Sequence, residues 1–337
     1  MRERIKKIFE NLEEEVDVIL ISTGMSGDKT FFYITGVTEG LFENSIAIAY
    51  PSGDYEIICP KLEEGIANAS VFQDVNERNR LIKEKVSGEK IGVNGDKLTY
   101  KEYRNLKKLF PKAKFFDVWE AIAKARLIKD KEEIKNIKKA CNISASIAER
   151  LYSLFDSNIR ECDVKAEINY MMEKENASPA FDTIVAFGKN SAQPHHKSVK
   201  KKFVMPVLCD FGAAYKNYCS DVTRTFVSKK QREVYDVVKE GKFIALDMMK
   251  EGVRAGDVAK SINEFFIKKG FKKMIHSLGH SLGLSPHDGF SINEKNDEIM
   301  KENMILAVEP AIYLKNFGIR IEDDVLVKKN GVEVLTK

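Results

Sequence analysis

The stretch DFGAAYKNYCSDVTRTF, residues 210–226, decides the fold of this 337-residue chain. An apolar segment, Val204–Cys209, precedes it and reads as a strand. A second strand is predicted for Tyr218–Val227, which is rich in Thr, Val and Phe. The residues between them, Ala213–Asn217, suit a turn, so the stretch predicts a β-hairpin.

Two acids, Asp210 and Asp221, lie at either side of this hairpin. A hairpin centred between Tyr215 and Lys216 places these two acids directly opposite each other on one face of the sheet. Like charges in that arrangement destabilise a sheet, so a positive group is expected between them.

A second acidic hairpin is predicted near the C-terminus, in MILAVEPAIYLKNFGIRIEDDVLV, residues 304–327. A turn at Leu314–Gly318 places Glu309 directly opposite Glu322. Two such hairpins together present four carboxylates.

A histidine-rich segment, HSLGHSLGLSPHDG at residues 276–289, adds His280 to these acids. A pair of divalent metal ions is the simplest way to hold two Asp, two Glu and one His together. The alternative is that the acids are solvated strand residues, but paired acids within apolar strands are costly unless they are compensated.

Composition and charge exclude several classes of protein. Lys and Arg total 55 and Asp and Glu total 51, and a net charge of +4 is too small to indicate nucleic-acid binding. The five cysteines show no CxxC spacing and are interpreted as reduced thiols of a cytoplasmic protein. No signal peptide or membrane-spanning stretch is recognised, so no membrane partner is expected.

The region from Val16 to Trp119 alternates short strands with helices and is predicted to be an α/β domain. Strands are expected in VDVILIS, SIAIAY and YEIICP, the last two forming a hairpin around PSGD, and a helix is expected in EEGIANAS. No phosphate-binding glycine loop occurs here. The charged patch Lys124–Lys131 marks the expected boundary between domains 1–123 and 124–337.

The second domain is predicted to mix long helices with the two hairpins. Helices are expected over Leu127–Phe155, Asp163–Glu175, Gln231–Lys250 and Ala255–Lys269.

The motifs FDTIVAFGKNSAQPHH, DFGA, SDVTRTF, GHSLGLSPHD, EPAIY and RIEDDVLV together resemble the pita-bread metallopeptidases, which include proline dipeptidase, aminopeptidase P and methionine aminopeptidase. The likeness in motifs covers roughly residues 121–336, and the N-terminal domain resembles that of the proline-specific and creatinase branches. It implies an α+β fold: a C-terminal pita-bread domain behind a creatinase-like N-terminal α/β domain.

The resemblance implies a site with two divalent metal ions, and Mn, Co, Fe and Zn all suit its ligands. Asp210 chelates one ion and Asp221 bridges both. His280 and Glu309 complete the second ion's protein ligands, and Glu322 bridges from the other side. The bridged ions lower the pKa of a shared water, so that hydroxide is present near neutral pH to attack the peptide carbonyl.

Further residues receive roles from the same resemblance. Glu309 also shuttles the proton to the leaving nitrogen. His195 and His287 match positions that contact substrate and stabilise the tetrahedral intermediate, although a lone histidine is often only a satisfied polar residue. Thr223 and Arg320 are expected to orient the carboxylates.

His196 matches no family position, and His276 falls outside the motif.

Specificity is less well determined by the sequence. Typical proline dipeptidases follow the histidine that matches His287 with Glu and then an Arg that binds the substrate carboxylate. This chain has Asp288 and no such Arg; Lys197 and Lys200–Lys202 are candidate replacements.

Chain length favours an Xaa-Pro dipeptidase acting on small Xaa-Pro peptides, and the resemblance implies a homodimer. Aminopeptidase P acting on longer peptides is the alternative, and a non-catalytic pita-bread binding module is a more distant one.

Overall fold

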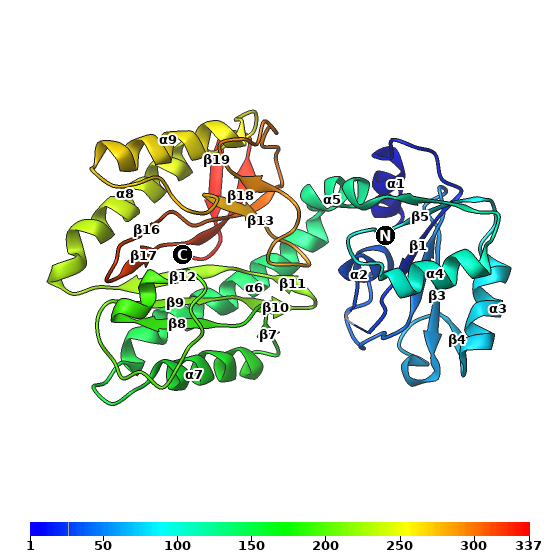
Figure 1. Ribbon diagram of the computed structural model, residues 1–337, viewed down its shortest axis with the longest axis horizontal. Coiled ribbons are helices and arrows are strands. Elements are labelled where there is room, and N and C mark those ends of the chain that lie inside the picture. Colours follow the sequence, from blue (N-terminus) through cyan, green and yellow to red (C-terminus); the bar gives the residue numbers. More distant parts are fainter. Residues whose placement is uncertain (26) are drawn as a thin grey trace. The chain divides into compact units, whose positions relative to one another are not determined.

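The computed structural model describes residues 1–25 and 27–337 and separates into two compact units, Met1–Arg126 and Leu127–Lys337 (Figure 1). The boundary suggested by the charged patch lies slightly earlier in the chain, and helix α5 (Trp119–Leu127) runs across both positions. No helix in the described part of the chain combines the length and apolar character needed to cross a membrane.

The first unit is built on one six-stranded sheet, in the order β4-β3-β2-β1-β5-β6. Its strands are β1 (Val18–Ser22), β2 (Ile46–Ala49), β3 (Tyr55–Pro60), β4 (Ser70–Phe72), β5 (Lys90–Val93) and β6 (Lys114–Asp117). Its other helices are α1 (Arg2–Glu10), α2 (Lys29–Thr35), α3 (Val75–Lys85), α4 (Tyr100–Leu109) and the 3-10 turn η1 (Lys61–Glu63). The predicted hairpin of β2 and β3 is confirmed, with Ala49 opposite Tyr55.

One predicted helix of this unit is wrong. Residues 63–70, EEGIANAS, continue from η1 through a turn into β4. Gly65 within this stretch has a φ of 85°, a left-handed conformation that ends a helix rather than continuing it.

The second unit combines four helices with short antiparallel sheets in the orders β11-β10-β7, β12-β9-β8, β14-β13-β15-β18-β19 and β16-β17. The helices are α6 (Lys131–Arg150), α7 (Glu161–Lys174), α8 (Arg232–Met248) and α9 (Ala255–Lys268), with 3-10 turns η2 (Leu151–Leu154), η3 (Gly188–Ala192) and η4 (Lys229–Gln231). The strands are β7 (Ser178–Pro179), β8 (Ile184–Phe187), β9 (Val207–Phe211), β10 (Ala213–Tyr215), β11 (Tyr218–Cys219), β12 (Val222–Phe226), β13 (Gly279–Ser281), β14 (Ser291–Ile292), β15 (Ile305–Val308), β16 (Ala311–Tyr313), β17 (Gly318–Arg320), β18 (Asp323–Lys328) and β19 (Gly331–Val334).

Two apolar cores hold this unit together, one for each pair of helices. Helices α6 and α7 pack on β8, β9 and β12, with Ile143, Ile168 and Phe211 fully or nearly fully buried. Helices α8 and α9 pack on the sheets that contain β15 to β18. Figure 1 shows the strands between the two helix pairs.

Helix α6 starts later than predicted because Asp130 caps it. The Asp130 carboxylate accepts hydrogen bonds from the backbone N–H groups of Glu132 and Glu133, which fixes the first turn at Lys131 rather than Leu127.

The register of the first hairpin differs from the prediction. Asp210 pairs with Thr223, not with Asp221. The turn consists of Lys216 and Asn217, with φ of 49° and 67°. Two consecutive left-handed residues form the tight turn that best matches the twist of antiparallel strands, and this choice moves the hairpin centre by one residue.

The acids of this hairpin stay on one face of the sheet in the observed register. Gly212 and the pair Ser220–Asp221 lie between the two ladders of paired residues. A Cβ on Gly212 would lie 1.9 Å from the Ser220 carbonyl oxygen, so the chains approach too closely for any other residue. Asp221 is two residues from Thr223, the partner of Asp210, so Asp210 and Asp221 share one face of the sheet and line the same cavity.

The register of the second hairpin is confirmed. Ala311 pairs with Arg320 in one ladder, and Val308 pairs with Asp323 in the next. Glu309 and Glu322 hold the corresponding facing positions in the gap between these ladders.

Candidate metal centre

Asp210 lies on β9 and forms an ion pair with Arg320 through Oδ2. Its other oxygen, Oδ1, is buried and has no hydrogen-bond partner among the described residues. A buried carboxylate oxygen without a partner is costly, and a cation at this position would satisfy it.

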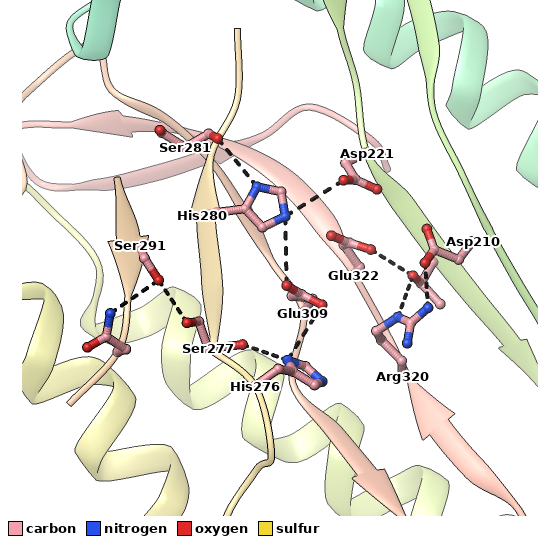
Figure 2. Close-up of polar contacts among 12 residues, drawn as sticks. Asp210, Asp221, His276, Ser277, His280, Ser281, Ser291, Glu309, Arg320 and Glu322 are labelled. Carbon is pink, nitrogen blue, oxygen red and sulfur yellow. Dashed lines mark hydrogen bonds and ion pairs between the residues drawn. The ribbon is translucent and has the colours of Figure 1, made fainter. Parts of the chain in front are cut away.

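Asp221 lies just before β12 and is held by its backbone. Its N–H donates to Asp324 Oδ2 over 2.8 Å. This leaves its own carboxylate pointing at His280, with 3.7 Å between Oδ2 and Nε2 (Figure 2).

The two hairpins are joined by a chain of polar contacts. Thr223 Oγ1 donates to Glu322 Oε2 over 2.7 Å, and Arg320 Nε donates to Thr223 Oγ1 over 3.0 Å. Arg320 also contacts Asp210, so one guanidinium is linked directly to Asp210 and through Thr223 to Glu322 (Figure 2). These contacts are the ones expected if Thr223 and Arg320 orient the carboxylates.

His280 lies on β13 between two acids. Its Nδ1 is 3.3 Å from the Ser281 carbonyl oxygen, which only accepts, so Nδ1 carries the hydrogen. The lone pair of Nε2 then faces Asp221 and Glu309, each 3.7 Å away. Burial and the neighbouring His287 lower the pKa of His280 to about 3, so its ring is neutral and able to bind a metal.

The acids carry more negative charge than the surrounding protein compensates. Burial, and then the charge of neighbouring carboxylates, raises the pKa of Asp221 and Glu322 well above the ordinary range. Burial raises the pKa of Glu309 to about 8. Ligand atoms of Asp221, His280 and Glu322 all lie within 4.8 Å of one another. Oxygen ligands with one imidazole suit divalent cations, and these residues therefore fit a metal site.

A cavity of about 190 Å³ opens over this cluster. Its other walls include Phe181, Ile184, Pro194, His195, Pro286 and His287. The His287 ring stacks on that of His280, with centroids 3.9 Å apart and planes inclined by 22°. The structure thus brings His195 and His287, both predicted from sequence, close to the predicted metal ligands.

Two residues of the site were not predicted, His276 and Tyr313. His276 lines the cavity, and its Nδ1, which donates to the Ser277 carbonyl oxygen, is 3.7 Å from Glu309 Oε2 (Figure 2). Tyr313 donates to His276 Nε2 over 3.2 Å and accepts from Arg320. Strand alternation in EPAIY, which puts Tyr313 on the same face as Glu309, was the signal available in the sequence.

The cavity has few positive groups for a substrate. Among its lining residues in the described part of the chain, Arg320 is the one side chain with a permanent positive charge, and Asp210 already binds it. Lys197 and Lys200–Lys202 are not among these lining residues, and Asp288 is buried with its N–H bonded to Ser281.

Comparison with known proteins relates both units to characterised families. Residues 135–329 match metallopeptidase family M24, and residues 2–128 match the creatinase/prolidase N-terminal domain. The chain is 32% identical to the Xaa-Pro dipeptidase of Pyrococcus furiosus, a match that covers 100% of this chain and 98% of that protein.

Two solved structures are similar over almost the whole chain. The prolidase from Pyrococcus horikoshii OT3 has a TM-score of 0.90 at 30% identity, covering 99% of this chain and 98% of that one. The X-Pro aminopeptidase from Thermotoga maritima MSB8 has a TM-score of 0.86 at 31% identity, covering 96% of each chain.

Proposed function

Because the chain belongs to metallopeptidase family M24 and begins with a creatinase/prolidase N-terminal domain, we propose that it hydrolyses Xaa-Pro peptide bonds as an Xaa-Pro dipeptidase. The observation that carries this proposal is the largely buried cluster of four carboxylates and one neutral histidine beneath a cavity. The full-length similarity to the Pyrococcus furiosus Xaa-Pro dipeptidase supports the choice of bond.

Five residues of this cluster would hold two divalent ions: Asp210, Asp221, His280, Glu309 and Glu322. The ions are drawn from Mn, Co, Fe and Zn, and when bound they would activate a water and polarise the scissile carbonyl. The unpartnered Oδ1 of Asp210 and the raised pKa of Glu309 support their presence in the working protein.

The chain's own residues would position the peptide and move the proton. Glu309 takes the proton of the attacking water on a carboxylate oxygen and passes it to the leaving proline nitrogen. His195 and His287 face the developing negative charge on the carbonyl oxygen from the cavity wall. Arg320 and Thr223 keep the carboxylates of Asp210 and Glu322 in place.

A dedicated enzyme suits this bond because proline supplies no N–H to it, and peptidases that bind the scissile N–H are poorly matched. Phe181, Ile184 and Pro194 offer apolar walls for the proline ring.

Aminopeptidase P activity on longer peptides is the second candidate function. The absence of a free permanent cation among the described cavity residues favours it, because a dipeptide carries its carboxylate into the cavity. The similarity to the Thermotoga maritima X-Pro aminopeptidase points the same way.

Hydrolysis of Met-Pro and of Met-Pro-Ala-Ala by manganese-loaded protein distinguishes the two. We expect cleavage of Met-Pro with little action on the tetrapeptide. The reverse preference makes the protein an aminopeptidase P. No cleavage of either peptide, with two metal ions bound, refutes the assigned substrate, and a protein that binds no metal is a non-catalytic binding module.

A homodimer and a cytoplasmic location complete the proposal. The location is supported by the five cysteines, none of which forms a disulfide and four of which are buried. Sedimentation of the metal-loaded protein tests the dimer.

A further inference from the structure

His196 is the histidine for which the motifs offered no role, and it lies next to a residue of the site. His195 is exposed and lines the cavity, whereas His196 is buried with 9% of its surface accessible. His196 contacts a buried acid, Glu161, through its Nε2 over 2.9 Å. The side chains of these two neighbouring residues therefore lie in different environments. His195 lines the cavity, whereas His196 packs in the protein interior.

Glu161 lies in the first turn of α7 and is fully buried. Its Oε1 accepts from the Phe187 N–H over 2.7 Å and from Asn190 Nδ2 over 2.8 Å. Its Oε2 accepts from His196 Nε2 over 2.9 Å and from the Val199 N–H over 3.0 Å. A carboxylate has about four acceptor positions, so all of them are used.

The donors come from every part of the segment that carries His195. Phe187 ends β8, Asn190 lies in η3, and His196 and Val199 lie in the following loop. Further backbone bonds fix that loop to the start of α7, from Glu161 N–H to the Lys201 oxygen over 3.1 Å and from Cys162 N–H to the Val199 oxygen over 3.2 Å. Within this network, His196 is the side chain closest in sequence to His195.

We propose that His196 and Glu161 are positioning residues that hold His195 at the cavity wall, an inference that rests on the proposed function. The His196 ring donates to Glu161 through Nε2–H, because the carboxylate oxygen accepts. Loss of this donor leaves one acceptor position of a buried carboxylate empty and releases the backbone next to His195. Displacement of a substrate-positioning group by about 1 Å is enough to reduce turnover by about 10²-fold.

The test compares His196→Leu with His196→Gln, alone and combined with His195→Ala. His196→Leu is expected to lower kcat/KM for the cleaved Xaa-Pro peptide by about 10-fold to 10²-fold. His196→Gln, whose amide nitrogen can reach the place of Nε2, is expected to restore most of the activity. In the His195→Ala background, His196→Leu is expected to have no further effect, because it acts through His195.

Ile168→Val, on the buried face of α7 in the apolar core, is the matched control for general loss of stability. We expect it to lower the thermal midpoint and leave kcat/KM unchanged in both backgrounds. Equal losses from His196→Leu with and without His195 would overturn the proposal, as would full activity of His196→Leu.

Hydrogen exchange gives a readout that does not depend on the proposed activity. The Val199 and Phe187 amides, both donors to Glu161, are expected to exchange faster in His196→Leu than in the wild type and to regain protection in His196→Gln. Unchanged protection of these amides in His196→Leu would overturn the proposal that His196 and Glu161 hold this segment. A wild-type protein that cleaves no Xaa-Pro peptide but shows the expected exchange contradicts only the proposed function.

Discussion

At the scale of single residues, the main feature of the second unit is a cluster of carboxyl groups that are largely removed from water. Asp210, Asp221, Glu309 and Glu322 gather in one cluster, and Arg320 is the one permanent cation among the described residues that line their cavity. Carboxylates in this position retain protons until a stronger cation replaces them, as the raised pKa of Glu309 illustrates.

We predict that the metal-free protein loses stability as the pH rises from 6.5 to 8. The pKa of Glu309 is raised from 4.5 to about 8, so in this range the folded state keeps a proton that the unfolded state has released. The folded state then binds more protons, and the free energy of unfolding falls with pH. The lowered pKa of His280 has the opposite effect, but only below its ordinary value of 6.5.

Calorimetry of chelator-treated protein at the two pH values checks this prediction. The thermal midpoint is expected to be lower at the higher pH, and Glu309→Gln is expected to reduce the difference. A thermal midpoint that rises with pH would contradict the raised pKa of Glu309 in the folded protein.

The residues of the site differ in how far the sequence could place them. His195, His287 and the four acids were recognised because each lies in its own local motif, and all line one cavity. His276 and Tyr313 enter the site through packing of β16 and the segment before β13, and this proximity has no counterpart in sequence spacing. Their roles, like those of the predicted ligands, remain proposals for mutagenesis.

At the scale of secondary-structure elements, the two acidic hairpins show what periodicity can and cannot predict. The second hairpin follows the predicted register throughout. The first was wrong by one residue at its centre, because the turn type, and not the facing acids, sets the register. Asp210 and Asp221 still share one face, because Asp221 is two residues from Thr223, the partner of Asp210. The close approach of Gly212 to Ser220 cannot be read from a single sequence.

We predict that Lys216→Gly stabilises the second unit. Lys216 has a φ of 49°, which is unfavourable for a residue with a Cβ and is free of strain for glycine. A gain of about 0.5–1 kcal/mol corresponds to a thermal midpoint about 1–4 °C higher for a unit of this size. Lys315→Gly, at the tip of the other hairpin where φ is not positive, is the control and is expected to give no gain.

Scanning calorimetry of both variants measures the effect. A lower midpoint for Lys216→Gly would count against the left-handed turn.

At the scale of the whole molecule, the similarity of sequence and structure agrees with the fold predicted from the motifs. A creatinase-like N-terminal α/β domain precedes a pita-bread domain, and the family matches confirm both. The alternation of strands and helices and the charged patch at Lys124–Lys131 suggested two domains, whereas the sheet order of each unit required the structure. Each unit has its own buried core, so each is expected to have its own unfolding transition.

We predict that divalent metal stabilises only the unit formed by Leu127–Lys337. At a free concentration of about 100 times Kd, a bound ion adds about 2.7 kcal/mol, which corresponds to roughly 5–10 °C in the thermal midpoint of that transition. Chelation is expected to abolish peptide cleavage, and added Mn or Co to restore it.

Calorimetry with and without manganese separates the transitions, and Asp221→Asn, which weakens the cluster, is the control expected to lose the shift. Movement of the first unit's transition, or of neither, contradicts this assignment.

The division of the acids between two hairpins determines when the site can become complete during protein synthesis. Asp210 and Asp221 belong to the half of the unit built on α6 and α7, whereas His280, Glu309 and Glu322 belong to the half built on α8 and α9. During synthesis, the first half emerges from the ribosome with only two of the five groups. No nascent chain that ends before Glu322, and no fragment left by a protease that cuts between the halves, holds the complete set, so the complete site forms only when both halves have docked.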